Sequence, residues 1–156
     1  WEGLQNTELA SRFPLQLVSP HPRYSFHTKG DGKDSTINDI EQHRVLIDDY
    51  YYWIARINPN DAAARGIKHH ELVRLYNDRA AVICAAAVSK RVMPGMIHAW
   101  ESSAVYDPIG EPGKSADRGG CINQLTPDRS QTEKTTASAP NSCLIEIEPW
   151  DGREDY

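Results

Sequence analysis

Residues 57–88 decide the fold class, and they have the sequence INPNDAAARGIKHHELVRLYNDRAAVICAAAV. A polar residue and a proline precede a run of alanines, and Gly66 follows the arginine after them, which predicts a short capped helix. Two largely apolar runs come next, at 72–76 and 81–88, joined by the tetrapeptide Asn-Asp-Arg-Ala. This pattern predicts a β-hairpin directly after the helix.

Short strands are predicted on both sides of this stretch. The aromatic and β-branched runs indicate strands at 15–19, 50–57, 96–100 and 142–148, and a short helix is expected at 40–49. Residues 29–38, 101–120 and 127–141 are polar and rich in turn formers, so they are expected to be loops. Brief strands separated by turns favour a mainly β fold with short helices, closed into a barrel, over a parallel doubly wound sheet.

The length and composition bound the classes of function. The chain has 156 residues, enough for one domain, which we place at 15–148, with a connector at 1–14 and a tail at 149–156. A net charge of −5 argues against a nucleic-acid partner held by a general positive field. The sequence contains no apolar run long enough to span a membrane.

Cysteine usage and the first residues bear on the compartment. The chain has three cysteines with no close pair, a pattern that fits a reducing environment. The first residues lack the features of a signal peptide, and the first residue is not Met. A cytoplasmic location is therefore expected, with a periplasmic one open if an export signal lies upstream.

Residues 17–28, LVSPHPRYSFHT, place many hydrogen-bond donors directly after a buried strand. One interpretation is a metal site built on His21 and His27, but zinc sites usually draw on closer ligand pairs and on Cys-x-x-Cys, which is missing. A second is a site for an anion or heterocycle, formed by hydroxyls, histidines and Arg23. The third is an ordinary surface loop. The density of donors after a strand favours a ligand.

Two further segments can contribute to a site. Residues 96–101, MIHAWE, end a strand in polar and aromatic groups that either line a pocket or pack a barrel end. Residues 118–126, RGGCINQLT, combine two glycines, which let a backbone approach closely, with Asn123, which can donate and accept. An ordinary Gly-Gly turn is the alternative. The histidine pair His69-His70 is expected to be solvated, and the chain lacks the motifs of nucleophilic catalysis.

Taken in order, these segments resemble the C-terminal domain of molybdopterin oxidoreductases, the dimethyl-sulfoxide-reductase superfamily. The resemblance covers about 15–148 and rests on residues 19–28, 57–67, 72–79, 92–95 and 119–126. It implies a six-stranded double-psi β-barrel. Within the superfamily, residues 98–108 and 115–120 are most similar to transhydroxylases that act on polyhydroxylated benzenes.

The resemblance also implies a ligand and partners. The ligand would be bis(molybdopterin guanine dinucleotide) with molybdenum or tungsten, bound here by Ser19, Pro20, His21, Arg23, His27, Thr28, Asn123 and Asn141. Arg23 would neutralise a pyrophosphate, and the two asparagines would bind pterin ring edges. The metal ligand and catalytic residues would lie in upstream domains of the same large subunit. An iron–sulfur small subunit and a small aromatic substrate would be the other partners.

Two other functions remain open at this point. One is a different molybdopterin oxidoreductase, of the sulfoxide- or polysulfide-reductase type. The other is a non-catalytic double-psi barrel that recognises peptides or proteins, because a fold does not fix a function.

Overall fold

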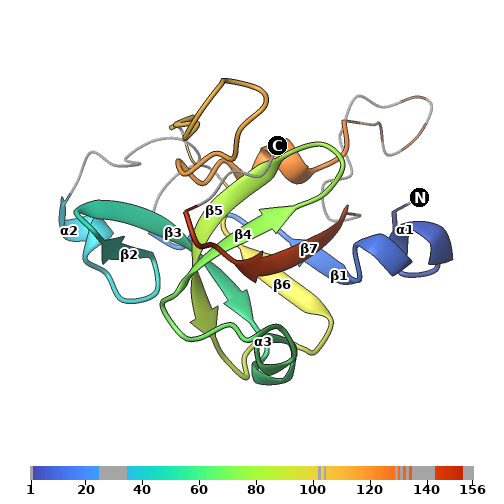
Figure 1. The fold of residues 1–156 in the computed structure, drawn as a ribbon, viewed down its shortest axis with the longest axis horizontal. Helices are drawn as coiled ribbons and strands as arrows, with labels where there is room; N and C mark the ends of the chain where they lie inside the picture. The colour runs from blue at the N-terminus through green and yellow to red at the C-terminus, as the bar shows by residue number, and fades with distance from the viewer. Residues whose placement is uncertain are drawn as a thin grey trace.

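The computed structural model describes residues 2–24, 35–101, 103, 105–128, 130, 132, 134 and 143–152. The elements run in the order α1 (Thr7–Arg12), β1 (Leu15–Val18), α2 (Ser35–Asn38), β2 (Arg44–Ile47), β3 (Tyr50–Ile57), α3 (Pro59–Arg65), β4 (Leu72–Tyr76), β5 (Ala81–Val88), β6 (Met96–Ala99), η1 (Ile122–Leu125) and β7 (Cys143–Pro149) (Figure 1). None of the helices in these ranges is long and apolar enough to cross a membrane.

Six of the strands close into a barrel, as predicted. Their order is β3-β5-β4-β7-β1-β6, and the pairing of β6 with β3 closes the ring. The β1–β6 and β3–β5 pairs are parallel, and the other four pairs are antiparallel. Strand β2 lies outside the ring, and within the described residues its one strand partner is β3. The chain is therefore mainly β with short helices.

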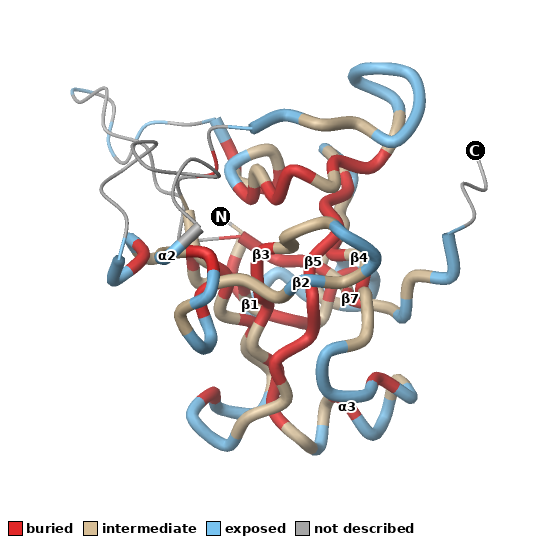
Figure 2. The backbone as a smooth tube through the Cα atoms, turned by 90° about the vertical axis from the view of Figure 1, so that its left-hand side faces the viewer, coloured by how far each residue is buried: buried red, intermediate tan, exposed pale blue. Residues whose placement is uncertain are grey.

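Alternating side chains fill the barrel, and a second apolar layer covers part of its outside. Leu15, Leu17 and Ile97 are among the fully or almost fully buried residues of the main core. Figure 2 shows this core as the red strand segments in the middle of the molecule. Strand β5 is buried along seven of its eight positions, because Ile83 packs outside the barrel with Ala116. The segment that contains Ala116 thus covers β5.

The helix and hairpin of residues 57–88 form as predicted. The Asn58 side chain accepts a hydrogen bond from Asn60 N at 3.0 Å, and Gly66 ends α3 with φ of +69°. Because α3 is capped at both ends by local residues, its sequence pattern was sufficient to find it. Strands β4 and β5 pair from Leu72↔Ala85 to Tyr76↔Ala81.

The helix expected at 40–49 is wrong, because this segment contains the strand β2. Ile47 pairs with Tyr50, and the two residues between them, Asp48 and Asp49, have φ of +48° and +63°. Aspartate tolerates this left-handed region, which two-residue hairpin turns require. Two short helices also lie in segments expected to be a connector and a loop: α1, which Asn6 caps through a bond from Leu9 N, and α2.

One end of the barrel, which we call the mouth, gathers the segments that the sequence singled out. From the strand pairings, β1, β4 and β6 finish there, and β3, β5 and β7 begin there. In Figure 1 the orange segment after β6 lies at the top, whereas α3 lies at the bottom, at the opposite end. Side chains at the mouth therefore come from distant parts of the sequence.

Candidate functional site

The loop after β1 exposes some of its polar groups and buries others. Ser19 is 5% exposed, and its Oγ has no hydrogen-bond partner among the described residues. The Pro20 carbonyl accepts from Glu101 N at 3.1 Å, and His21 Nδ1 contacts the Glu101 carboxylate. The loop after β1 is therefore attached to the end of β6.

Arg23 lies beside a cleft of about 480 Å³ that collects three guanidinium groups. The cleft is lined by Arg23, Tyr24, Ile40, Glu41, Gln42, His43, Arg56, Arg91 and Trp100. The Arg23 side chain stacks over the ring of Tyr24, with Cζ 5.4 Å from its centroid. One guanidinium group can donate two parallel hydrogen bonds to the oxygens of a phosphate. The volume of the cleft lies in the range of small-molecule binding sites. The cleft is therefore suited to an anionic ligand.

Arg56 organises one wall of this cleft. Its Nη1 lies 2.9 Å from His98 Nδ1, and its Cζ lies 4.8 Å from the centroid of the Trp100 ring. An arginine can only donate, so Nδ1 of His98 accepts and the ring proton resides on Nε2. Burial, and then the charge of Arg56, lower the pKa of His98 to about 4, so the ring is neutral near pH 7.

Trp100 fulfils both roles considered from the sequence. It lines the cleft and also packs against the main core of the barrel. Its ring meets that of His98 edge to face, with centroids 4.4 Å apart, yet its buried Nε1 has no hydrogen-bond partner among the described residues. A buried indole N–H normally finds a partner, so this donor is available to an acceptor outside the described residues.

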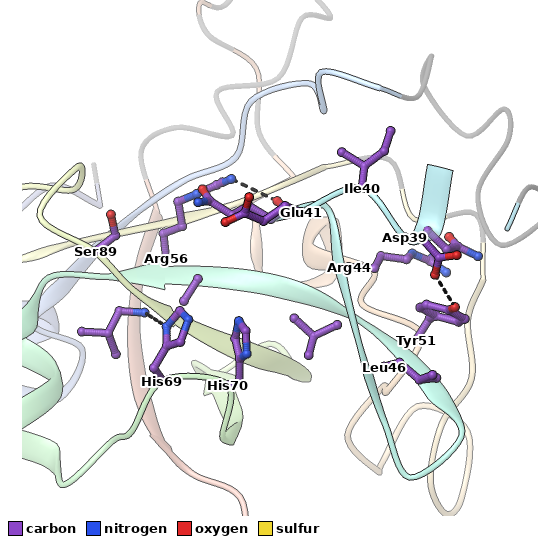
Figure 3. A pocket seen from close by; sticks show the side chains of 15 residues that line it. Asp39, Ile40, Glu41, Arg44, Leu46, Tyr51, Arg56, His69, His70 and Ser89 are labelled. Carbon is purple, nitrogen blue, oxygen red and sulfur yellow. Dashed lines mark hydrogen bonds between the residues drawn. The ribbon is translucent and has the colours of Figure 1, made fainter. Parts of the chain in front are cut away.

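A second cleft, of about 360 Å³, shares Arg56 with the first (Figure 3). The rings of His69 and His70 stack on its floor with centroids 3.9 Å apart, and both residues are exposed, as expected. His69 Nδ1 accepts from Val88 N at 3.1 Å. Asp39, which accepts from the Tyr51 hydroxyl at 2.6 Å, also lines this cleft. Its mixed charge suits a phosphate less well than the arginine-lined cleft does.

The two glycines of residues 118–126 approach the protein closely. A Cβ on Gly119 would lie 2.2 Å from the carbonyl oxygen of Val105, and a Cβ on Gly120 would lie 2.4 Å from Cδ1 of Trp53. The predicted close approach is therefore present, but its partners are parts of this chain. Asn123, three residues later, is exposed and free to face a ligand.

Trp53 links this segment to the loop after β1. Gly120 lies on its ring, the His43 ring meets it at 4.9 Å between centroids, and Tyr24 contacts His43 at 6.2 Å. The Trp53 Nε1, like Ser19 Oγ and Trp100 Nε1, is buried without a hydrogen-bond partner in the described ranges. Unpartnered buried donors and three arginines together fit a ligand rich in anionic and acceptor atoms.

The site residues predicted from the sequence and those that line the cleft in the structure are not all the same. His27, Thr28 and Asn141 were predicted to bind the ligand, and they lie outside the described residues. Arg56 and Arg91 line the cleft but were not predicted from the sequence, although an arginine within the apolar strand 53–57 is a signal of unusual burial.

All three cysteines are free thiols, and burial raises the pKa of Cys84 to about 12.

Comparison with known proteins identifies the family. The model of the family described as "Molydopterin dinucleotide binding domain" matches residues 15–144. This range contains the barrel, the loop after β1 and the Gly-Gly segment. The chain belongs to this family, which confirms the resemblance seen in the sequence.

Individual relatives agree with this assignment. The chain is 56% identical over 152 residues to the pyrogallol hydroxytransferase large subunit of Pelobacter acidigallici, and 33% identical over 150 residues to a trimethylamine-N-oxide reductase of Haemophilus influenzae. The two matches include 97% and 92% of this chain, respectively, but this chain spans only 17% of the length of each relative. In fold it resembles acetylene hydratase from Pelobacter acetylenicus, with a TM-score of 0.66 at 15% identity, covering 94% of this chain and 20% of that one.

Proposed function

We propose that this chain is the cofactor-capping domain of a larger molybdenum enzyme and that it binds bis(molybdopterin guanine dinucleotide) at the mouth of the barrel. The observation that carries the proposal is the cleft lined by Arg23, Arg56 and Arg91, which extends from the loop after β1 at the mouth along the side of the barrel. It lies near Ser19 and Trp100, whose buried donors have no hydrogen-bond partner among the described residues. The proposed contacts are Ser19, Pro20, His21, Arg23, His27, Thr28, Asn123 and Asn141.

The chemistry of these groups matches the parts of such a ligand. Arg23, exposed at the cleft, can bind a pyrophosphate through two parallel N–H bonds. Ser19 Oγ and Asn123 offer donors and acceptors to ring edges. When bound, the cofactor supplies the metal centre that carries out the redox chemistry. The barrel's part is to orient the cofactor and to keep water away from it.

The parent enzyme, in this proposal, transfers hydroxyl groups between polyhydroxybenzenes such as pyrogallol, with no net redox change. The support is the 56% identity with the pyrogallol hydroxytransferase large subunit. The metal ligand and the catalytic residues belong to upstream domains, and an iron–sulfur small subunit and a cytoplasmic location complete the proposal. Reduction of an N-oxide is the second candidate, supported by the 33% identity with the reductase.

Replacing Arg23 by alanine in the full-length enzyme tests the cofactor site. A pyrophosphate that loses a charged partner is held less tightly, by about 1.5–3 kcal/mol for a bond to a charged group. We expect the purified Arg23→Ala enzyme to retain several-fold less molybdenum and guanine nucleotide per protein than the unaltered enzyme. Both contents are measured by metal analysis and by chromatography of the released nucleotide.

Arg12→Ala is the matched control, because Arg12 is an exposed arginine on α1 that pairs with Asp78 and does not line the cleft. Its cofactor content should equal that of the unaltered enzyme. Normal molybdenum and nucleotide in Arg23→Ala would refute the site. Turnover of pyrogallol or of trimethylamine N-oxide by the unaltered preparation then distinguishes the two candidate reactions.

A further inference from the structure

Asp117 is a fully buried carboxylate at the mouth of the barrel, with 0% exposure. Its backbone is fixed to the start of β5: Asp117 N donates to Ala81 O at 3.0 Å, and Ile83 N donates to Asp117 O at 2.9 Å. The carboxylate therefore projects from a rigid part of the barrel. Asp117 is not one of the proposed cofactor contacts.

Four N–H groups surround this carboxylate. Oδ1 accepts from the backbone N–H groups of Asp107 at 2.8 Å and Gly119 at 2.9 Å. Oδ2 accepts from Cys121 N at 2.8 Å and from Gln124 Nε2 at 3.0 Å. A buried charge is tolerated only when such donors replace its water, so the four bonds and the charge depend on one another.

The bonds to Oδ2 lie on either side of Asn123. Cys121 precedes Asn123 by two residues and Gln124 follows it directly, and both donate to the same oxygen. Gly119 and Gly120, held against Val105 and Trp53, fix the approach to this turn. The exposed Asn123 is thus presented by a turn whose shape is set from beneath by a single carboxylate.

We propose that Asp117 is a positioning residue for cofactor binding, which acts by holding Asn123 at the mouth of the barrel. The inference rests on the proposed function, because it takes Asn123 as a cofactor contact. It goes beyond that function by assigning the orientation of the contact to a residue that never touches the ligand. A residue that only stabilised the barrel would show no energetic link to Asn123.

A double-mutant cycle in the full-length, cofactor-loaded enzyme tests this link. The variants are Asp117→Asn, Asn123→Ala and the pair together, and the readout is the rate at which guanine nucleotide is released in dilute denaturant. The amide introduced by Asp117→Asn would turn an N–H toward groups that are themselves donors. We expect each single variant to release cofactor roughly tenfold faster, the scale of one lost strong hydrogen bond. The double variant should release it no faster than the faster single variant.

Ser115→Ala is the control, because Ser115 Oγ accepts from Gly110 N at 3.0 Å in the same segment, whereas the four bonds to the Asp117 carboxylate come from other residues. Its release rate should match that of the unaltered enzyme. Gln124→Ala repeats the cycle more gently, since it removes one of the four donors and leaves the carboxylate in place. It supplies the result if Asp117→Asn does not fold.

The outcomes separate the two proposals. A double variant whose acceleration equals the product of the two single accelerations would mean that Asp117 acts independently of Asn123, and would overturn the positioning role alone. An Asn123→Ala enzyme that releases cofactor at the unaltered rate would remove Asn123 from the site and the inference with it. If Arg23→Ala also retained its cofactor, the proposed function itself would fail.

Discussion

Gly120 lies against the indole of Trp53 with φ of +80°. An alanine there would combine an unfavourable left-handed backbone with a Cβ 2.4 Å from the ring. We expect Gly120→Ala to lower the free energy of unfolding by about 3 kcal/mol, the sum of strain and overpacking. Urea unfolding of the chain, followed by tryptophan fluorescence, measures this change.

Gly113 separates the two contributions, because its φ is +78° and a Cβ there would meet nothing within 4 Å. Gly113→Ala should cost only the backbone strain, about 1 kcal/mol. Equal losses for the two variants would mean that Trp53 moves aside, and that the close contact does not constrain the segment before Asn123.

Residues that are contiguous in the chain were the ones that the sequence could identify. Ser19, His21 and Arg23 follow one strand within five positions, so a single motif contains them. Arg56 joins the site only because β3 pairs with β6 and brings it opposite His98. Asp117 is harder still to identify from the sequence, since nothing in its spacing distinguishes a buried, hydrogen-bonded aspartate from a solvated one in a loop.

At the scale of the elements, the stability contributed by the β3–β6 pair is expected to depend on pH. The pKa of His98 falls from its ordinary 6.5 to about 4, through burial and the charge of Arg56. Between these two pKa values His98 is protonated in the unfolded chain and neutral in the folded chain, so acid favours unfolding. The stability from neutral His98 is complete above pH 6.5 and is lost as the pH falls toward 4.

We therefore expect the unaltered chain to lose more stability than His98→Gln between a pH above 6.5 and one midway between these two pKa values. Urea unfolding of both proteins at the two pH values measures the difference. Parallel losses in the two proteins would show that His98 is not kept neutral by Arg56 and by burial.

The strands expected at 15–19, 50–57, 96–100 and 142–148 are present as β1, β3, β6 and β7. The helix and the hairpin of residues 57–88 are in addition fixed by local contacts. Helix α3 carries its own caps, and β4 and β5 meet through a short turn. Strand β2 was mistaken for a helix because Val45 and Ile47 lie in a short segment whose period is ambiguous. Its pairing with the aromatic residues of β3, from Arg44↔Trp53 to Ile47↔Tyr50, decides in favour of a strand.

At the scale of the whole molecule, closure of the barrel joins segments that no local pattern relates. Leu17 pairs with Ile97 and with Cys143, so β1 completes the ring with strands from the middle and the end of the chain. The brief strands could indicate a barrel, and the family resemblance implied six strands, but the order of the strands is known only from the structure. The same closure brings the loop after β1 and the Gly-Gly segment to one mouth.

Hydrogen–deuterium exchange of the full-length enzyme, compared with and without its cofactor, tests the central claim most directly. The cofactor should contact the mouth, so we predict slower exchange in residues 19–24 and 119–126 of the loaded enzyme. Helix α3, at the opposite end of the barrel, is the internal control and should exchange equally in both forms. Unchanged exchange at 19–24 and 119–126, or protection confined to α3, would contradict the assignment of this chain as a cofactor-capping domain.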